Sequence, residues 1–191
     1  MRYFISDTHL GDPRLGIEQG KPNVFFRPFT SIMQENTEIL LSILNTLKEG
    51  DELWHVGDVI VDNKYEFLLK IMKESLPNVK MNLIIGNYDD DKLEMLSKYF
   101  DNIVIDETIE IEGKKIYLNH YPINCKKKLD SDLNIVFCIC GHVHSLWKIQ
   151  PKMINVSIEC WNYKPVSEEE IKFIIKAHNE HYDNNVFPYI K

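Results

Sequence analysis

Seven side chains of types that bind metal ions stand in a regular relation to short apolar runs of the chain. They are Asp7, His9, Asp58, Asn87, His120, His142 and His144. Each follows an apolar run, as Asp7 follows Tyr3-Phe4-Ile5 and His120 follows Ile116-Tyr117-Leu118. Short runs rich in β-branched and aromatic residues predict buried strands, so the polar residues are expected on the loops that leave the strand ends. Such loops bind ligands in open α/β sheets, which predicts a metal-dependent hydrolytic site.

The types of the ligands narrow the choice of metal. Imidazole and carboxylate together suit Mn²⁺, Fe, Zn²⁺, Ni²⁺ or Co²⁺ better than Ca²⁺ or Mg²⁺. We take Mn²⁺ as the expected ion. The amide of Asn87 would complete a coordination shell without adding charge.

The elements that must position these side chains can be read from the spacing of apolar residues. Helices are expected over about 31–48, 65–76 and 89–99, and a capping box of Ser167 and Glu170 precedes a helix over 171–178. Strands are expected over 2–6, 103–105, 109–111, 116–118, 134–140 and 153–158, and before Gly57 and Gly86. A turn at 112–114 predicts a hairpin. Helices dominate the first half and strands the second, which favours a β-sandwich flanked by helices.

Residues 10–30 form an irregular segment that leaves the Asp7 and His9 strand end, so it is expected to rim the site. It carries basic residues among Phe25, Phe26 and Phe29, a combination that can clamp phosphate and stack on bases. We favour the simpler interpretation, in which the phenylalanines pack in a satellite core or a subunit contact. Arg27 is the one residue expected to contact substrate.

Composition limits the class of protein. At 191 residues, with 44% hydrophobic and 27% charged residues, the chain is expected to form one domain, 1–191. A net charge of −7 argues against strong nucleic-acid binding, although a nucleotide could still be a substrate. No apolar run approaches the roughly 20 residues of a membrane span. Four cysteines without a Cys-x-x-Cys pair predict reduced thiols and a cytoplasmic location. The run Lys126-Lys127-Lys128 is expected in a solvated loop.

The motifs together resemble the calcineurin-like metallophosphoesterase family. They read Asp7-Thr8-His9, Gly57-Asp58, Gly86-Asn87-Tyr88-Asp89, a lone His120, and Gly141-His142-Val143-His144. Five blocks in the family's order, between residue 3 and about 144, are far more specific than any one of them.

The resemblance implies a four-layer α/β/β/α sandwich with two divalent metal ions in one cleft. Carried over by position, Asp7, His9 and His144 would hold one ion. Asn87, His120 and His142 would hold the other, with Asp58 bridging the two. Two ions about 3.5–4 Å apart can orient a phosphoryl group and share a hydroxide that attacks phosphorus in line. His142 and His144 would help to stabilise the developing charge.

Three glycines, Gly57, Gly86 and Gly141, directly precede ligands. The backbone turns sharply at such strand ends, so each is expected to need a positive φ.

Tyr88 departs from the family's pattern, which has histidine at this position. That histidine pairs with the following acidic residue and protonates the leaving oxygen, which is worth about 10²–10⁴-fold in rate. A phenol is a much weaker acid than imidazolium, so esters with good leaving groups should be hydrolysed best. A second interpretation is that Tyr88 supplies the same proton or packs against a base. The expected catalytic residues are Asn87, Tyr88, Asp89 and His142.

We therefore expect a binuclear phosphoesterase that acts on phosphodiesters, including nucleotides, in preference to phosphomonoesters. The alternative is an interaction scaffold of the same fold with little or no activity. All seven ligands are present, which favours the enzyme. The resemblance to single-domain members also implies that the chain can form homo-oligomers.

Overall fold

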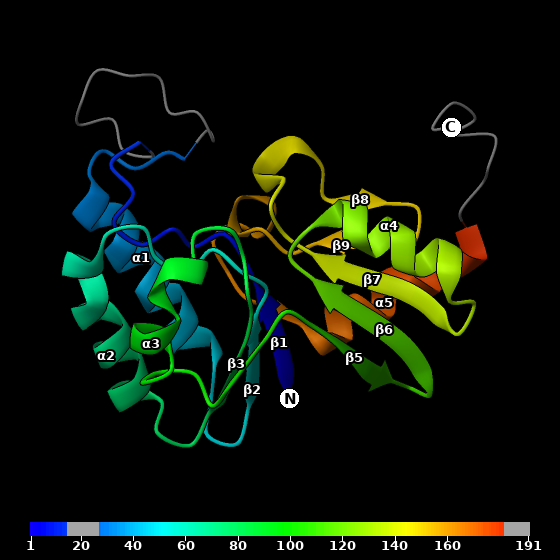
Figure 1. Ribbon diagram of the computed structural model, residues 1–191, viewed down its shortest axis with the longest axis horizontal. Helices are drawn as coiled ribbons and strands as arrows, with labels where there is room; N and C mark the ends of the chain where they lie inside the picture. The colour runs from blue at the N-terminus through cyan, green and yellow to red at the C-terminus, as the bar shows by residue number, and fades with distance from the viewer. Residues whose placement is uncertain (15–26, 182–191) are drawn as a thin grey trace.

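The computed structural model describes residues 1–14 and 27–181 and contains two five-stranded sheets packed face to face (Figure 1). The first sheet has the order β10-β1-β2-β3-β4, in which β1 to β4 are parallel and β10 is antiparallel to β1. Its strands are β1 (Arg2–Ile5), β2 (Glu52–His55), β3 (Lys80–Ile84), β4 (Asn102–Val104) and β10 (Val166–Ser167). Because β1, β2 and β3 run parallel, their carboxyl ends meet at one edge of the sheet.

The second sheet has the order β5-β6-β7-β9-β8 and is also mixed. The turn at Glu112-Gly113 joins β5 and β6 as the predicted antiparallel hairpin, whereas β6, β7 and β9 are parallel. Its strands are β5 (Asp106–Ile111), β6 (Lys114–Asn119), β7 (Ile135–Cys140), β8 (Ile149–Gln150) and β9 (Met153–Asn155). The carboxyl ends of β6 and β7 therefore lie together, as those of β1 to β3 do.

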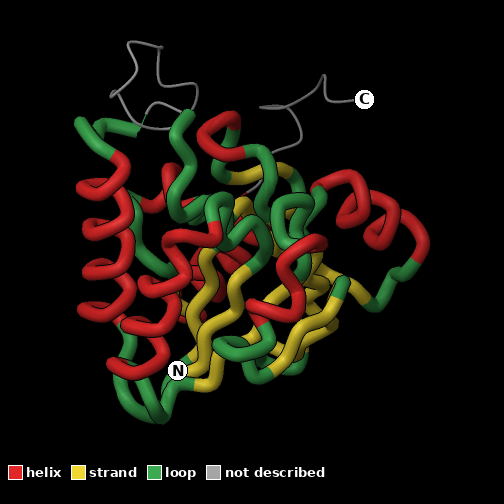
Figure 2. Tube along the Cα trace, turned by 60° about the vertical axis from the view of Figure 1, so that its left-hand side comes forward, coloured by secondary structure: helices red, strands yellow, loops and turns green. Residues whose placement is uncertain are grey.

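Helices cover the outer faces of the two sheets, which confirms the expected α/β fold with mixed sheets flanked by helices (Figure 2). The first sheet is covered by α1, α2 and the short α3, and the second by α4. The α-helices are α1 (Ile32–Thr46), α2 (Glu66–Ser75), α3 (Leu93–Leu96), α4 (Pro122–Ser131) and α5 (Glu168–His181). Short 3₁₀ turns are η2 (Asn63–Tyr65), η3 (Asp90–Lys92), η4 (His144–Leu146) and η5 (Ile158–Trp161).

The alternation of side chains along the strands explains why both faces of the first sheet are buried. In β1, Phe4 enters the core between the two sheets, whereas Ile5 packs in the core beneath α1 and α2. In β2, Trp54 and Leu53 divide in the same way. Strands buried on both faces read as continuous apolar runs, which is the pattern from which they were predicted.

Most of the predicted helices are present, and their ends follow the expected signals. Ser31 caps α1 by accepting a hydrogen bond from the Gln34 amide at 3.1 Å. Ser167 and Glu170 form the capping box before α5, with reciprocal bonds of 2.8 Å and 3.2 Å. The long helix predicted over 89–99 is wrong, because only the turn η3 and the four-residue α3 form there.

The expectation of a loop at Lys126-Lys127-Lys128 is also wrong, because these residues lie within α4. Pro122 begins this helix, and Cys125 is its buried side chain, packed against β7. With one fully buried position and an exposed Ile123, the apolar periodicity that would reveal the helix is weak.

Two further expectations concern a membrane span and the cysteines. No helix within 1–14 or 27–181 is long and apolar enough to cross a membrane. All four cysteines are free, and Cys125, Cys138 and Cys140 are buried together.

Candidate metal centre

The seven predicted ligands come together where strands of the two sheets end. Asp7 and His9 follow β1, Asp58 follows β2 and Asn87 follows β3. From the second sheet, His120 follows β6, and His142 and His144 follow β7. Residues separated by more than 130 positions thus face one another across the junction of the sheets, as in the bond from the His142 amide to Asp7.

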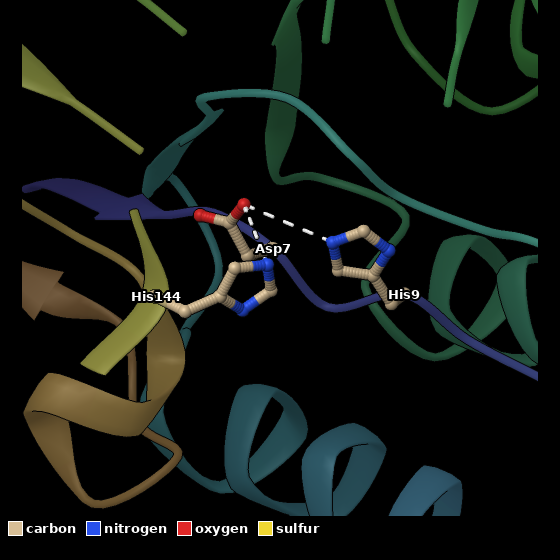
Figure 3. A group of neighbouring side chains, drawn as sticks. All are labelled: Asp7, His9 and His144. Carbon is tan, nitrogen blue, oxygen red and sulfur yellow. Dashed lines mark ion pairs between the residues drawn. The ribbon is translucent and has the colours of Figure 1, made fainter. Parts of the chain in front are cut away.

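Asp7, His9 and His144 form one group, which we call group 1, and all three are buried (Figure 3). One ligand atom from each lies within 4.8 Å of the others. Asp7 Oδ1 is 3.8 Å from Nε2 of His9 and 3.8 Å from Nε2 of His144. In Figure 3 one nitrogen of each imidazole is joined by a dashed line to the Asp7 carboxylate, and the two rings stack at 5.0 Å between centroids.

Asp58, His120 and His142 form a second group, group 2, with ligand atoms again within 4.8 Å of one another. His120 Nε2 is 3.3 Å from Asp58 Oδ2. His142 Nδ1 lies 3.1 Å from Oδ1 of Asn87, so the predicted amide ligand stands beside this group. Asn87 and His142 are exposed, which makes group 2 the open side of the centre.

Asp58 connects the two groups. Its Oδ2 atom is 3.4 Å from Nε2 of His9 in group 1 and 3.3 Å from Nε2 of His120 in group 2. Its other oxygen accepts a hydrogen bond from the Tyr88 amide at 2.9 Å. Asp58 therefore lies between the two groups.

The donor set fits divalent cations. His120 Nδ1 donates to the Val56 carbonyl at 2.8 Å, which fixes the tautomer and turns Nε2 toward Asp58 as a buried atom without a hydrogen-bond acceptor of suitable geometry. A backbone carbonyl behind a ligating histidine is a usual arrangement in metal sites. His144 is oriented in a similar way, since its Nδ1 bonds to Glu159 Oε1 at 2.9 Å.

The charged groups of the cluster shift one another's pKa values. Burial by itself would lower the pKa of His120, but the carboxylates of Asp58 and Asp7 raise it to about 9. Burial would likewise raise the pKa of Asp58, but His120 and His9 lower it overall. His120 and the two carboxylates thus favour one another's charged forms, and binding of a cation by His120 would require loss of its proton.

The backbone at the ligands is strained. Asp7, His9, Asp58, His142 and His144 all have left-handed φ angles, between 45° and 73°. Residues other than glycine rarely adopt this conformation, and the cost of order 1–3 kcal/mol each is a feature of functional sites. The turns after β1, β2 and β7 therefore direct five ligand side chains at a cost to stability.

Only one of the three glycines has the expected positive φ. Gly57 has φ +92° and a Cβ there would lie 2.4 Å from Nδ1 of His120. Gly86 and Gly141 lack a positive φ, so that expectation is wrong for them. They are required for space, because a Cβ would lie 2.3 Å from Asp58 Oδ1 at Gly86 and 2.5 Å from Ser6 Oγ at Gly141.

Sequence reasoning missed the residues that hold group 1 from behind. Ser6 and Ser157 donate their hydroxyls to Asp7 Oδ2 at 2.6 Å and 2.7 Å. Glu159, whose side chain is 3% exposed, accepts from His144. Burial would raise the pKa of Glu159, but the charge of Arg27 and the bond to His144 lower it overall. Ser157 and Glu159 lie beyond the last motif, where no spacing signal marks them.

The expectation that Arg27 contacts substrate does not agree with its position. Its side chain is buried and pairs with Glu35 and with Glu159, whose Oε1 accepts from Nη2 at 2.6 Å. It also donates to the carbonyl of Asp7 at 2.6 Å. Arg27 therefore joins α1, the loop after β1 and the glutamate that bonds to His144.

The 10–30 segment also carries the phenylalanines that were expected to pack in a satellite core or a subunit contact. Phe29 is buried and its ring packs edge-on against Tyr163 at 4.8 Å between centroids, as the satellite-core interpretation predicts. Phe25 and Phe26 lie outside the described residues.

The family's histidine pairs with the acidic residue that follows it, which is Asp89 in this chain. The Asp89 carboxylate instead bonds to the backbone. Both of its oxygens accept backbone amides, from Asp58 and Gly86 at 2.8 Å and from Val59 at 2.9 Å. Burial raises the pKa of this carboxyl while the bonds to Val59 and Gly86 act against the rise. Asp89 thus ties the loop after β2 to the loop after β3 and positions Asp58.

Tyr88 lies at the rim of group 1. Its ring is in edge contact with the His9 ring, 4.9 Å between centroids. The Arg14 guanidinium lies over the Tyr88 ring at 5.2 Å. The residue that replaces the family's histidine therefore contacts a ligand on one side and a cation on another.

Comparisons with known proteins agree with this geometry. Residues 2–157 match the model of the calcineurin-like phosphoesterase superfamily domain. An uncharacterized protein of Methanocaldococcus jannaschii is 29% identical over 185 residues, which cover 91% of this chain and 90% of that protein. The crystal structure of a protein of unknown function from Aquifex aeolicus is 31% identical, with a TM-score of 0.69 and coverage of 91% of this chain and 98% of that one. The chain belongs to the calcineurin-like phosphoesterase superfamily.

Proposed function

We propose that the protein is a phosphodiesterase that uses two divalent metal ions, with Mn²⁺ as the preferred ion. The observation that carries this proposal is the position of Asp58, whose Oδ2 lies within 3.4 Å of an imidazole nitrogen from each ligand group. A single structural ion would need only one group of ligands. Two groups that share one carboxylate suit a pair of cations that act on a phosphoryl group together.

The ligands divide between the ions as the motifs suggest. Asp7, His9 and His144 would hold the first ion, and Asn87, His120 and His142 the second, with Asp58 between them. When bound, the ions supply the Lewis acidity that polarises the phosphoryl group and activates water as the nucleophile. Asn87 and His142 are the exposed members, so the phosphoryl group is expected to approach from their side.

The chain's own residues position this chemistry. The buried bonds to Ser6, Ser157 and Glu159 fix Asp7 and His144 before substrate arrives. Asp89 fixes the Asp58 loop through three amides. Such supporting contacts keep the reacting groups within a small range of geometries, which is where much of the rate gain of an enzyme originates.

Tyr88 sets the expected range of substrates. A phenol protonates a leaving oxygen less readily than imidazolium does. Aryl phosphodiesters, whose leaving groups need no proton, should therefore be hydrolysed faster than alkyl or nucleoside esters. Diesters are preferred over monoesters in this proposal because the group 2 side of the centre is open.

The test is to remove metal with a chelator, add back Mn²⁺, and assay bis(p-nitrophenyl) phosphate and p-nitrophenyl phosphate side by side. Faster turnover of the diester is expected. Mg²⁺ in place of Mn²⁺ is expected to support much less activity.

A scaffold with a metal site but little or no activity is the second candidate, and the observation in its favour is the tyrosine at position 88. Binding of Mn²⁺ without turnover of either ester would decide for the scaffold. Two further expectations belong to this proposal: a cytoplasmic location, suggested by the free thiols, and self-association, which sedimentation of the purified protein would test.

A further inference from the structure

A half-exposed arginine is held beside group 1 by a buried acid. Arg14 donates from Nε to Asp12 Oδ1 at 2.8 Å and from Nη2 to Asp12 Oδ2 at 2.5 Å. The Asp12 side chain is 0% exposed, whereas that of Arg14 is 51% exposed. The Arg14 amide also donates to Asp12 Oδ1 at 2.9 Å. A buried carboxylate therefore holds one edge of the guanidinium, while about half of the Arg14 side chain remains exposed.

The Tyr88 ring is a second restraint on the guanidinium, beside Asp12. The cation lies over the ring at 5.2 Å, and the ring is 4.9 Å from that of the ligand His9. Asp12 and Tyr88 both favour the charged form of Arg14 and raise its pKa. With two restraints already in place, little conformational freedom remains to be lost when an anion binds.

The remaining donors of Arg14 match an oxyanion. Its pair with Asp12 uses the edge formed by Nε and Nη2, so the N–H groups of Nη1 lie outside that ion pair. Planar guanidinium binds phosphate oxygens with good geometry, and it does so better than lysine.

The position of Arg14 favours a phosphate other than the one under attack. Its ion pair is with Asp12 rather than with the ligand carboxylates Asp7 or Asp58. The Tyr88 ring provides its connection to His9, so the guanidinium stands at the rim of the centre. The side where the phosphoryl group is expected to react is formed by Asn87 and His142 instead.

We propose that Arg14 binds a second phosphate of the substrate, and that preferred substrates carry a phosphate next to the ester that is hydrolysed. This inference rests on the proposed phosphodiesterase function. It also gives Tyr88 a role, since its ring lies against the arginine. Nucleoside bisphosphates, nucleic-acid ends and nucleoside polyphosphates share the required chemistry.

The test compares two substrates that differ only in the second phosphate. They are the p-nitrophenyl ester of thymidine 5′-phosphate and the same ester with an added 3′-phosphate. With the Mn²⁺-loaded full chain, kcat/KM should be about tenfold higher for the 3′-phosphorylated ester. This ratio is what one partly exposed charge-assisted contact can contribute. Arg14→Met should remove this preference. Arg2→Met is the matched control, because Arg2 pairs with Glu168 at the other end of β1 and should keep the preference.

A binding measurement separates this inference from the proposed function. Calorimetry should show tighter binding of thymidine 3′,5′-bisphosphate than of thymidine 5′-phosphate, and Arg14→Met should make the two equal. Comparison with thymidine diphosphate tells whether the second phosphate lies across the sugar or in a pyrophosphate. The inference is overturned if wild type shows no preference or if Arg14→Met weakens both members of each pair equally. Hydrolysis of the ester without the 3′-phosphate would then leave the proposed function standing.

Discussion

The two ligand groups meet at Asp58 but are supported in different ways. Group 1 is buried and held by charged and hydroxyl side chains, with Glu159 behind His144 and Arg27 behind Glu159. Group 2 is supported by the Val56 carbonyl behind His120 and by the Asp89 carboxylate, which accepts three backbone amides around Asp58, and it ends in the exposed His142. Buried ionic support fixes geometry at a cost in desolvation, whereas an exposed ligand can move and exchange.

This difference suggests a division of labour. Group 1 should bind its ion first and more tightly, because its ligands are already oriented and shielded from water. Group 2 should hold an ion that exchanges more readily and faces the substrate. Each prediction below would break or sharpen this contrast, beginning with the largest expected effect.

Replacement of Arg27 by methionine should destabilise the protein by about 3–5 kcal/mol, because Glu35 and Glu159 would remain buried without their cation. Urea denaturation of the metal-free protein measures this change. Lys70→Met is the control, since the exposed pair with Glu74 should contribute about 1 kcal/mol or less. Equal losses of unfolding free energy for the two variants would mean that the buried ion pairs behind group 1 stabilise the protein no more than an exposed pair does.

Asp58→Asn removes the charge that both groups share but keeps an oxygen for the Tyr88 amide. Turnover of bis(p-nitrophenyl) phosphate should fall by more than about 100-fold, since a ligand should matter at least as much as the outer contacts that cost 10–100-fold. Mn²⁺ titration should show weaker binding at both groups. Asp91→Asn, at a residue that is 79% exposed, should change neither measurement. Weakening of only one Mn²⁺ site would argue against a bridging carboxylate.

Glu159→Gln tests the contrast most directly. It keeps the shape behind His144 but removes the charge, so the affinity of the tighter Mn²⁺ site should fall by about 10–100-fold. Calorimetric titration should show the weaker site unchanged. The matched variant is Asn87→Ser, beside His142, which should affect the weaker site alone. If Glu159→Gln acted on the weaker site, the assignment of tight binding to group 1 would be wrong.

The sequence predicted the residues of this site that lie directly after strands. Asp7 and Asp58 follow parallel strands of one sheet, whose carboxyl ends meet at one edge, so position along the chain placed them near one another. His120 follows a strand of the second sheet, and only the resemblance to the family placed it in the same centre. The capping box at Ser167 was readable for the same reason, because it is a local pattern with local geometry.

The supporting residues could not be predicted in this way. Arg27, Glu35 and Glu159 come from three separated segments, and only the folded chain shows that they form one buried ionic cluster. Charged residues are usually exposed, so a sequence pattern assigns Arg27 to the surface. The roles of Gly86 and Gly141 depend on the proximity of other loops, which no local propensity reports.

The smallest expected effect concerns Tyr88, at the junction of the two groups. Tyr88→His should raise turnover of alkyl and nucleoside phosphodiesters relative to aryl diesters, because imidazolium protonates a leaving oxygen more readily than a phenol. The full 10²–10⁴-fold of general acid catalysis is not expected. Asp89 already accepts three backbone amides, which hold its carboxylate toward the backbone rather than toward a new imidazole. A relative gain of about tenfold is therefore the expectation, measured as the ratio of kcat/KM for thymidine 5′-methylphosphate and its p-nitrophenyl counterpart.

Tyr88→Phe, which keeps the ring but removes the hydroxyl, should leave this ratio unchanged. A fall of the ratio in Tyr88→Phe would show instead that the tyrosine hydroxyl itself delivers the proton.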